Sequence, residues 1–269
     1  MSDHTPRQRK YLSQVFLKET WPAERMVEIV RNWKAQAVVE IGPGDGVLTQ
    51  LLLDQGLQVH AVEKDQRFAE RLTDRWREQG NFSLTEGDIL SFDFEAWAAS
   101  CGYERIAIVG NIPYSISSLI LKWALPQLER VVGVGLMTQR EFAERVASAP
   151  DKKSYGSLSV FTQMRATVEL VCEVPKTVFK PVPKVDSAIV TLQHKPVGYD
   201  DVQLRRIETI TKAAFSQKRK KLRNGIKAWL GKAGGEEAIS VDLERRPGTL
   251  SVAEYQQLAK EIFPEDFPA

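Results

Sequence analysis

Cysteine and histidine are scarce in this sequence, with two and three copies in 269 residues. Cys101 and Cys172 lie far apart and outside any C-x-x-C spacing, so we expect buried free thiols and neither a disulfide nor a zinc site. His4, His60 and His194 are equally scattered, without a pair at metal-ligand spacing. A metalloenzyme and a hydrolase with a histidine base therefore have little support, and no bound metal is expected.

Long hydrophobic runs are also absent. No apolar stretch approaches the length that crosses a bilayer, and the N-terminal "MSDHTPRQRKYLSQ" lacks the apolar centre of a signal peptide. We therefore expect a cytoplasmic protein that has no membrane partner. Hydrophobic residues make up 43% of the chain, which is enough for the core of one large domain or of two.

The charges nearly cancel, with a net charge of +2, but they are unevenly distributed. Residues 203–232 contain ten Lys or Arg and a single acid, Glu208, whereas the chain beyond 235 is acidic. The densest cluster consists of Lys218, Arg219, Lys220, Lys221 and Arg223. Such a run is often no more than a solvated helix face, but the asymmetry also suggests a polyanionic partner.

Between about 37 and 135, short β-rich runs alternate with helical stretches. Strands are expected at 37–42, 58–63, 82–88, 106–111 and 132–137. The intervening "VLTQLLLDQG" and "DQRFAERLTDRWREQG" have helical spacing and end on glycine, a common C-cap. This alternation predicts an α/β fold with a doubly wound, mostly parallel sheet. From about 200 the pattern becomes helical, which predicts a smaller helical C-terminal domain.

Several polar or glycine residues fall at the carboxyl ends of the predicted strands, where such sheets bind ligands. Gly42, Gly44 and Gly46 follow the first strand, and glycine lets a ligand approach the backbone closely. Glu63 ends the second strand and can accept hydrogen bonds from ribose hydroxyls. Asp88, after the third strand, can accept a hydrogen bond from the amine of an adenine. Together they indicate an adenosine-containing cofactor, either NAD or S-adenosylmethionine.

The fourth predicted strand runs directly into Asn111, Ile112, Pro113 and Tyr114. Alone, this sequence is an ordinary turn. At a cofactor site it also suits methyl transfer to the amino group of adenine. The Asn111 side-chain oxygen and the Ile112 carbonyl can accept from the two N6 hydrogens, while Pro113 stiffens the turn and Tyr114 stacks on the base. No strong base is required, so this motif favours S-adenosylmethionine over NAD.

"NIPY" resembles the (N/D/S)-(P/I/L)-P-(Y/F/W) motif of amino-group methyltransferases. Together with "RKYLSQVFLKE", "VVEIGPGDGVLT", "VEKD" and "GDIL", it resembles the ribosomal RNA adenine dimethyltransferase family from about Arg9 to the C-terminus. The resemblance implies a Rossmann-like class I fold with S-adenosylmethionine contacts at Val15, Leu17, Gly42, Glu63, Asp88 and Asn111. Members usually carry Asn or His at the position of Val15. A backbone contact survives that change, and a side-chain hydrogen bond does not.

The resemblance also extends to the second half of the chain. In "FKPVPKVDSAIVTL", Phe179 resembles the residue that covers the target base opposite the tyrosine. "AFSQKRKKLRN" resembles the small-subunit enzymes of the family, and it makes an RNA-backbone grip the better interpretation of the basic cluster. The implied domains are 1–198, for cofactor binding and methyl transfer, and 199–269, for RNA binding.

The implied activity is N6-dimethylation of two adjacent adenines in the 3′-terminal hairpin loop of 16S rRNA. The expected partner is that RNA, and no DNA, within a small-subunit precursor, bound by a monomer. Three alternatives stay open: a 23S rRNA methyltransferase of the erythromycin-resistance type, a ribosome-assembly factor with weak catalysis, and an NAD oxidoreductase.

Overall fold

The computed structural model describes residues 15–196 and 198–267. The N-terminal motif residues 9–14 therefore lie outside the described residues. The chain forms two compact units: one contains the chain up to Ala143 together with Val168–His194, and the other contains Glu144–Thr167 together with the chain from Lys195. Residues 144–167 thus belong to the same unit as the C-terminal helices. The assignment of separate functions to domains divided at residue 198 stays a prediction.

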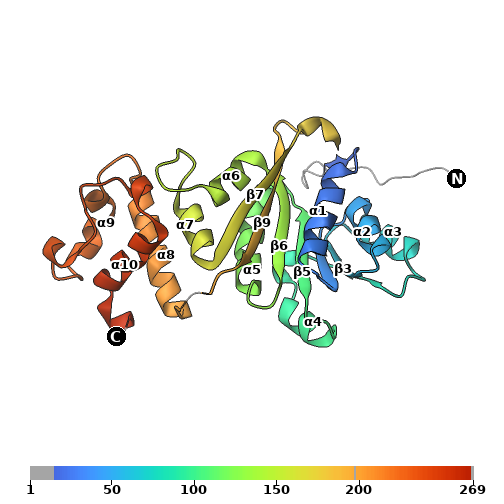
Figure 1. The fold of residues 1–269 in the computed structure, drawn as a ribbon, viewed down its shortest axis with the longest axis horizontal. Helices are drawn as coiled ribbons and strands as arrows, with labels where there is room; N and C mark the ends of the chain where they lie inside the picture. The colour runs from blue at the N-terminus through green and yellow to red at the C-terminus, as the bar shows by residue number, and fades with distance from the viewer. Residues whose placement is uncertain (1–14, 197, 268–269) are drawn as a thin grey trace. The chain divides into compact units, whose positions relative to one another are not determined.

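The first unit is built on a seven-stranded sheet with the order β4-β3-β2-β5-β6-β9-β7 (Figure 1). Its strands are β2 (Ala37–Ile41), β3 (Gln58–Glu63), β4 (Phe82–Glu86), β5 (Ile106–Asn111), β6 (Gly133–Gln139), β7 (Ala166–Val174) and β9 (Ser187–His194). The five strands β2 to β6 pair in parallel, and β9 pairs antiparallel with β6. The predicted doubly wound, mostly parallel sheet is therefore confirmed. The sequence analysis did not identify β7.

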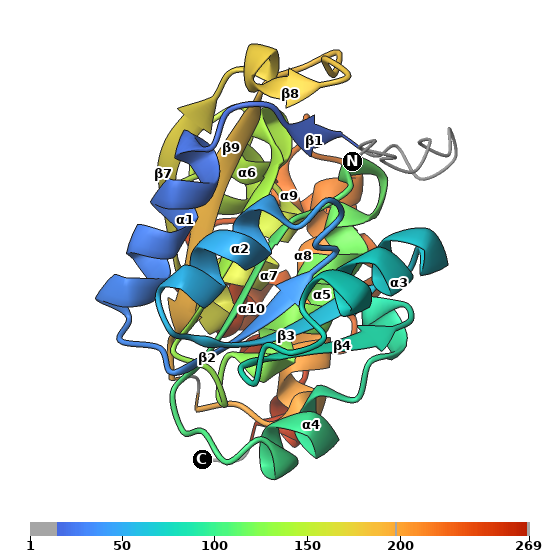
Figure 2. The same ribbon diagram turned by 90° about the vertical axis from the view of Figure 1, so that its right-hand side faces the viewer.

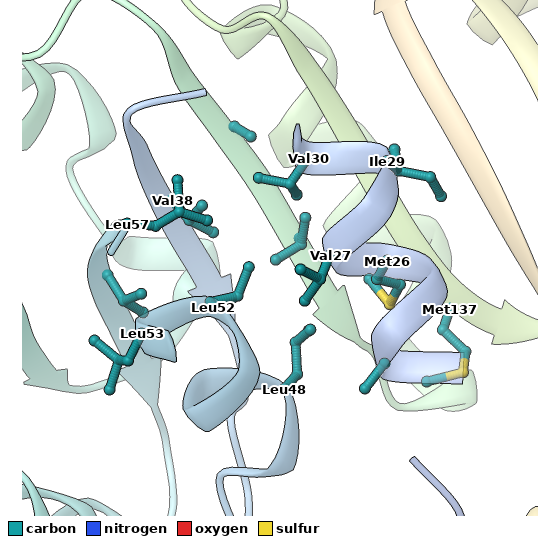
Figure 3. Packing of buried hydrophobic residues seen from close by; sticks show 14 of the residues in the cluster. Met26, Val27, Ile29, Val30, Val38, Leu48, Leu52, Leu53, Leu57 and Met137 are labelled. Carbon is teal, nitrogen blue, oxygen red and sulfur yellow. The ribbon is translucent and has the colours of Figure 1, made fainter. Parts of the chain in front are cut away.

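Three helices cover one face of the sheet: α1 (Trp21–Asn32), α2 (Val47–Asp54) and α3 (Gln66–Arg75) (Figure 2). Their apolar residues recur at helical spacing and pack on alternate residues of the strands, as Val30 and Leu52 do around Val38 (Figure 3). All three of these side chains are fully buried. Each such burial contributes about 1.5–3 kcal/mol to folding. α2 ends before Gly56, whose φ of 73° gives the expected glycine C-cap.

The opposite face of the sheet carries α4 (Phe94–Ser100) and α5 (Ser117–Gln127). The two helices meet through an edge-to-face contact between Phe94 and Trp123. On this face the buried His60 ring hydrogen-bonds the hydroxyl groups of Ser83 and Thr85. The ring also lies beside two aromatic rings, one in the segment that precedes α4 and one within α4. Burial lowers the pKa of His60 to about 4, so the ring is neutral at physiological pH.

A short ribbon places the segment after residue 14 against the sheet. Here β1 (Phe16–Leu17) pairs antiparallel with β8 (Phe179–Lys180), and the Lys18 N–H donates to the Val178 carbonyl at 2.7 Å. The Phe16 ring lies 5.4 Å from the Phe68 ring of α3. The ribbon therefore holds residues 15–17 beside the glycine turn that follows β2.

The second unit is helical, as predicted for the C-terminal region. Its helices are α6 (Arg140–Ala147, shared with the first unit), α7 (Ser157–Arg165), α8 (Asp201–Ser216), α9 (Leu222–Leu230) and α10 (Val252–Ile262). They surround a separate apolar core to which α7, α8, α9 and α10 all contribute. Capping boxes at Asp200 and Ser251 begin α8 and α10. A Cβ on Gly225 would lie 2.8 Å from the Ala213 carbonyl oxygen, so glycine allows α9 to approach α8 closely.

Short 3-10 helices complete the described chain, at Ile89–Ser91, Tyr114–Ile116, Lys176–Val178, Glu236–Ala238, Pro247–Thr249 and Pro264–Asp266. Cys101 and Cys172 are partly buried free thiols. Within residues 15–196 and 198–267, no helix has both the length and the apolar character that a bilayer crossing requires.

Candidate active site

A cavity of about 330 Å³ opens at the carboxyl ends of the parallel strands of the first unit. It lies where the sheet order reverses between β2 and β5, the usual ligand position in doubly wound folds. Ten residues singled out in the sequence line it: Val15, Leu17, Gly42, Gly44, Glu63, Asp88, Asn111, Ile112, Pro113 and Tyr114. The structure therefore brings these ten residues together, and their individual roles stay predictions.

The glycine turn after β2 adopts a backbone conformation that favours glycine at three positions. Gly42, Gly44 and Gly46 have φ values of 61°, 59° and 82°. A Cβ on Gly42 would meet no protein atom within 4 Å, so the backbone there is open to a ligand. A Cβ on Gly46 would lie 2.5 Å from the Trp76 ring, so this third glycine serves packing.

Glu63 ends β3 with its carboxylate fixed by two backbone groups. One oxygen accepts from the Gly44 N–H at 3.1 Å and the other from the Asp65 N–H at 2.8 Å. Burial raises the pKa of Glu63, and these two hydrogen bonds lower it. The side chain thus links the ends of β2 and β3 and retains lone pairs that can accept from hydroxyl groups.

Asp88 lies at the start of the 3-10 helix that follows β4. One carboxylate oxygen accepts from Lys64 Nζ at 2.7 Å, and the other accepts from the Leu90 N–H at 3.0 Å. The hydrogen bond from Lys64 lowers the pKa of Asp88, which keeps the group an acceptor. Each oxygen still has a free lone pair for a further donor at the cavity edge.

Asn111 ends β5 and is partly buried at the cavity wall. Its amide nitrogen donates to the Val15 carbonyl oxygen at 3.5 Å, the long end of hydrogen-bond range. The contact uses the backbone of Val15, so it does not need a polar side chain there. With its NH₂ group directed at Val15, the amide keeps its oxygen as an acceptor for another donor.

The turn after β5 is tied to neighbouring strands. The Ile112 N–H donates to the Met137 carbonyl at 2.9 Å, and Ser117 Oγ donates to the Pro113 carbonyl at 3.2 Å. The half-buried Tyr114 places its hydroxyl 2.6 Å from Ser187 Oγ. The predicted strand followed by a turn is therefore present, and the turn is rigidly held at the cavity.

Comparison with known proteins gives this constellation its context. The family model for ribosomal RNA adenine dimethylase matches residues 5–263. The chain belongs to the ribosomal RNA adenine dimethylase family. It is therefore an S-adenosylmethionine-dependent ribosomal RNA adenine dimethyltransferase.

Relatives share nearly the whole length of this dimethylase. The "Ribosomal RNA small subunit methyltransferase A" of Leptothrix cholodnii is 38% identical, with 96% of this chain and 93% of the relative covered. The protein of the same name from Pseudomonas fluorescens is 36% identical, with 98% and 97% covered. Among solved structures, a dimethyladenosine transferase from Plasmodium falciparum matches with a TM-score of 0.72 and 25% identity, covering 94% of this chain and 98% of that one. The 23S rRNA methyltransferase ErmE matches with a TM-score of 0.68 and 27% identity, covering 92% and 99%.

The cavity of this dimethylase fits S-adenosylmethionine in its chemistry. The acid at the end of β3 suits ribose hydroxyls, and the acid after β4 suits an adenine amine. The open backbone at Gly42 leaves room for the rest of the cofactor beside the turn.

Phe179 is not part of the cavity lining. Its side chain is 1% exposed and packs into the core of the first unit, and its backbone pairs with Leu17. The ring reaches a base only if it leaves that core. Its role in covering the target base stays a prediction.

The basic cluster lies in the second unit, at the turn between α8 and α9, and its members differ. Lys218 Nζ donates to the carbonyls of Lys153 and Tyr155 at 2.8 and 2.5 Å, so it holds the fold together. Lys221 and Arg223 both pair with Glu244. Arg219 and Lys220 are exposed, and no side-chain partner for them is seen among the described residues.

Several cavity residues were not predicted from the sequence, above all Glu40. This acid in β2 is 2% exposed, accepts from Thr49 Oγ1 at 2.6 Å, and has its pKa raised to about 8 by burial. Its signal was an acid inside the apolar run "AVVEI". Phe16, Asp45, Lys64, Ser115, Ile116 and Ile120 also line the cavity. Ser187, which bonds Tyr114, had no local signal because its partner is 73 residues away.

Proposed function

We propose that this dimethylase methylates N6 of two adjacent adenines in the 3′-terminal hairpin loop of 16S rRNA, on small-subunit precursors. The choice of substrate rests on one observation: relatives named for the small subunit are 36–38% identical over nearly the full length. ErmE, named for 23S rRNA, is 27% identical. Unpaired bases of a hairpin loop can also be splayed into a pocket, as the chemistry requires.

The turn after β5 performs the acceptor chemistry in this proposal. The Asn111 side-chain oxygen and the Ile112 carbonyl accept hydrogen bonds from the two N6 hydrogens. These bonds draw the nitrogen lone pair out of the purine ring and direct it toward the methyl donor. S-adenosylmethionine supplies a methyl group on a positively charged sulfur. The arrangement of Asn111 beside the cavity supports this role.

Tyr114 stacks on the extruded adenine, a contact worth about 1–3 kcal/mol. Transfer of the methyl group leaves N6 positively charged with one extra proton, and that proton is acidic enough to pass to water, so no protein base is needed. His60 cannot supply such a base in this structure, since both of its ring nitrogens are hydrogen-bonded to Ser83 and Thr85. Positioning and electrostatic stabilisation account for the rate.

The second unit grips the RNA backbone in this proposal. Arg219 and Lys220 are the members of the basic cluster whose charges are not used within the described fold. Phosphate contacts of this kind position an RNA without reading its sequence. In this proposal the enzyme meets the ribosomal precursor in the cytoplasm and acts there as a monomer.

The decisive experiment incubates immature small subunits with the enzyme and labelled S-adenosylmethionine, and then maps the methylated adenines. We expect dimethyladenine at the two loop positions, and none with Asn111→Ala. Labelling of 23S rRNA together with increased macrolide tolerance on expression would instead support the activity that ErmE's name describes. Normal particle maturation without any methylation would support a non-catalytic assembly factor.

A further inference from the structure

We infer that Ser187 is a positioning residue, which fixes the direction of the Tyr114 ring so that the ring forms one wall of the slot for the target base. This inference rests on the proposed function, because it assumes that Tyr114 stacks on an extruded adenine. The carrying observation is the 2.6 Å hydrogen bond between the two hydroxyl groups.

Ser187 is itself rigidly placed. It is the first residue of β9, is fully buried, and pairs in register with Gln139 at the end of β6. The residue before it is anchored twice: the Asp186 carbonyl accepts from the Arg140 N–H at 3.0 Å, and its carboxylate accepts from the Lys176 N–H at 3.0 Å. The Ser187 hydroxyl is therefore a fixed point in the sheet.

Tyr114, by contrast, lies in the short 3-10 helix Tyr114–Ile116 and is only half-buried. Its hydroxyl is the side-chain atom farthest from the backbone, so a bond there restrains the first side-chain torsion most strongly. The second torsion turns the ring about the axis that contains the hydroxyl, so the bond leaves the ring plane to packing. Ser187 thus sets where the ring points.

The direction of this ring matters because few rings are available at this end of the cavity. Phe16 and Tyr114 are the aromatic residues among those that line the cavity. The Phe16 ring lies beside Gly44 and Phe68. Phe179 is buried in the core. Beside Asn111, the stacking surface in this structure is therefore supplied by Tyr114.

A simpler explanation is that the bond merely satisfies a buried serine hydroxyl. The two explanations differ in what the bond does for RNA. If Ser187 only stabilises the fold, its removal affects all functions of the first unit alike. If it positions Tyr114, its removal affects the RNA substrate selectively, and only while the tyrosine hydroxyl is present.

The test is a double-mutant cycle of Ser187→Ala and Tyr114→Phe, each of which removes one partner of the bond. We expect each single variant to lower kcat/KM for RNA about three- to tenfold, the effect of one hydrogen bond, with an unchanged Kd for S-adenosylmethionine. The double variant should be no worse than either single variant. Ser187→Thr, which keeps the hydroxyl, should restore most of the activity.

Thr191→Val is the matched control. Thr191 is a buried residue of the same strand with no side-chain hydrogen bond to Tyr114, so its replacement should leave RNA kinetics unchanged. Additive effects in the cycle, or an equal loss of cofactor and RNA affinity, would overturn the inference. Thermal unfolding of every variant separates these results from simple misfolding.

A second measurement keeps the inference testable even if the proposed function fails. A hairpin RNA with 2-aminopurine at the target adenine reports stacking by fluorescence quenching, without any methyl transfer. Wild-type quenching that is reduced in Ser187→Ala and in Tyr114→Phe supports the inference even if no methylation occurs. The opposite outcome is methylation by the wild type, additive effects in the double-mutant cycle and the same quenching in the variants as in the wild type. That outcome would support the proposed function and reject the positioning role of Ser187.

Discussion

At the scale of single residues, glycines at the cofactor site have two separate physical tasks. Gly42 combines a positive φ with open space above its Cα, which suits close approach of a ligand. Gly46 combines a positive φ with direct contact against α3, because a Cβ would lie 2.5 Å from the Trp76 ring. Gly56, at the end of α2, has a φ of 73° and no neighbour within 4 Å of a Cβ.

We predict that Gly46→Ala destabilises the protein more than Gly56→Ala. Both variants strain a left-handed backbone conformation at a cost of about 1 kcal/mol. Gly46→Ala adds a steric clash of about 1–3 kcal/mol. Urea unfolding of the two variants measures the difference in free energy. Equal losses would show that α3 moves freely away from the turn.

Tyr114 gives a second prediction at this scale. Tyr114→Ala should lower RNA methylation by about tenfold or more, since stacking on a base is worth about 1–3 kcal/mol. Its effect on the Kd for S-adenosylmethionine should be small, because the ring is proposed to face the base. Titration of the cofactor and single-turnover methylation separate the two effects. Equal losses of both would contradict the proposed role.

At the scale of elements, the two faces of the sheet hold buried ionisable groups with opposite pH behaviour. His60 of β3 has a pKa lowered to about 4 by burial, and Glu40 of β2 has a pKa raised to about 8 by burial. The contribution of His60 to stability is present above its unfolded pKa of about 6.5 and is lost as pH falls toward 4. That of Glu40 is present below its unfolded value near 4.5 and is lost as pH rises through 8.

We therefore predict that His60→Gln removes a contribution to stability that weakens in acid. Between about pH 7 and about pH 5 the stability of the wild type should fall by about 1 kcal/mol relative to that of the variant, after allowance for solvent that screens part of the shift. The comparison with the variant is essential, since Glu40 acts in the opposite sense over much of this range. Urea unfolding at both pH values is the measurement. Parallel curves for the two proteins would show that His60 is accessible to a proton in the folded state.

At the scale of the whole molecule, the basic cluster illustrates how one sequence feature divides into separate physical roles. Lys218 bonds two backbone carbonyls, Lys221 and Arg223 share an acid, and Arg219 and Lys220 face solvent. The assignment of all five residues to RNA contacts stays a prediction. Arg219 and Lys220 are the two whose side chains have no partner among the described residues.

We predict that the double variant Arg219→Ala with Lys220→Ala binds RNA more weakly. The logarithm of its RNA-binding constant should also fall less steeply with the logarithm of salt concentration, by about 1 to 2 in the slope. Lys218→Ala should instead lower the stability of the second unit by about 1–2 kcal/mol, because two carbonyls lose their charged donor. Salt titrations of RNA affinity and thermal unfolding of both variants test the distinction. An unchanged salt slope in the double variant would mean that the turn is only a solvated surface.

Strand positions followed closely from sequence patterns, whereas α3 ends at Arg75 and is not capped by the glycine expected at position 80. β3 and β5 have the predicted limits, since both end at a polar residue and β5 is a continuous apolar run before it. The same rule placed Gly42, Glu63, Asp88 and Asn111 at one edge of the sheet, since parallel strands end together. β7 was missed because its alternate residues are exposed and it lacks such a run.

The sequence by itself thus determined the fold class, the family and ten residues of the cavity, because each depends on local pattern or motif. Only the tertiary structure decided which side chains pair. It buried Phe179, joined Tyr114 to Ser187 and Asn111 to Val15, and gave Glu40 and His60 their shifted pKa values. Those outcomes depend on contacts between residues far apart in the chain and on the exclusion of water by packed elements. Neither property is written in the spacing of nearby residues.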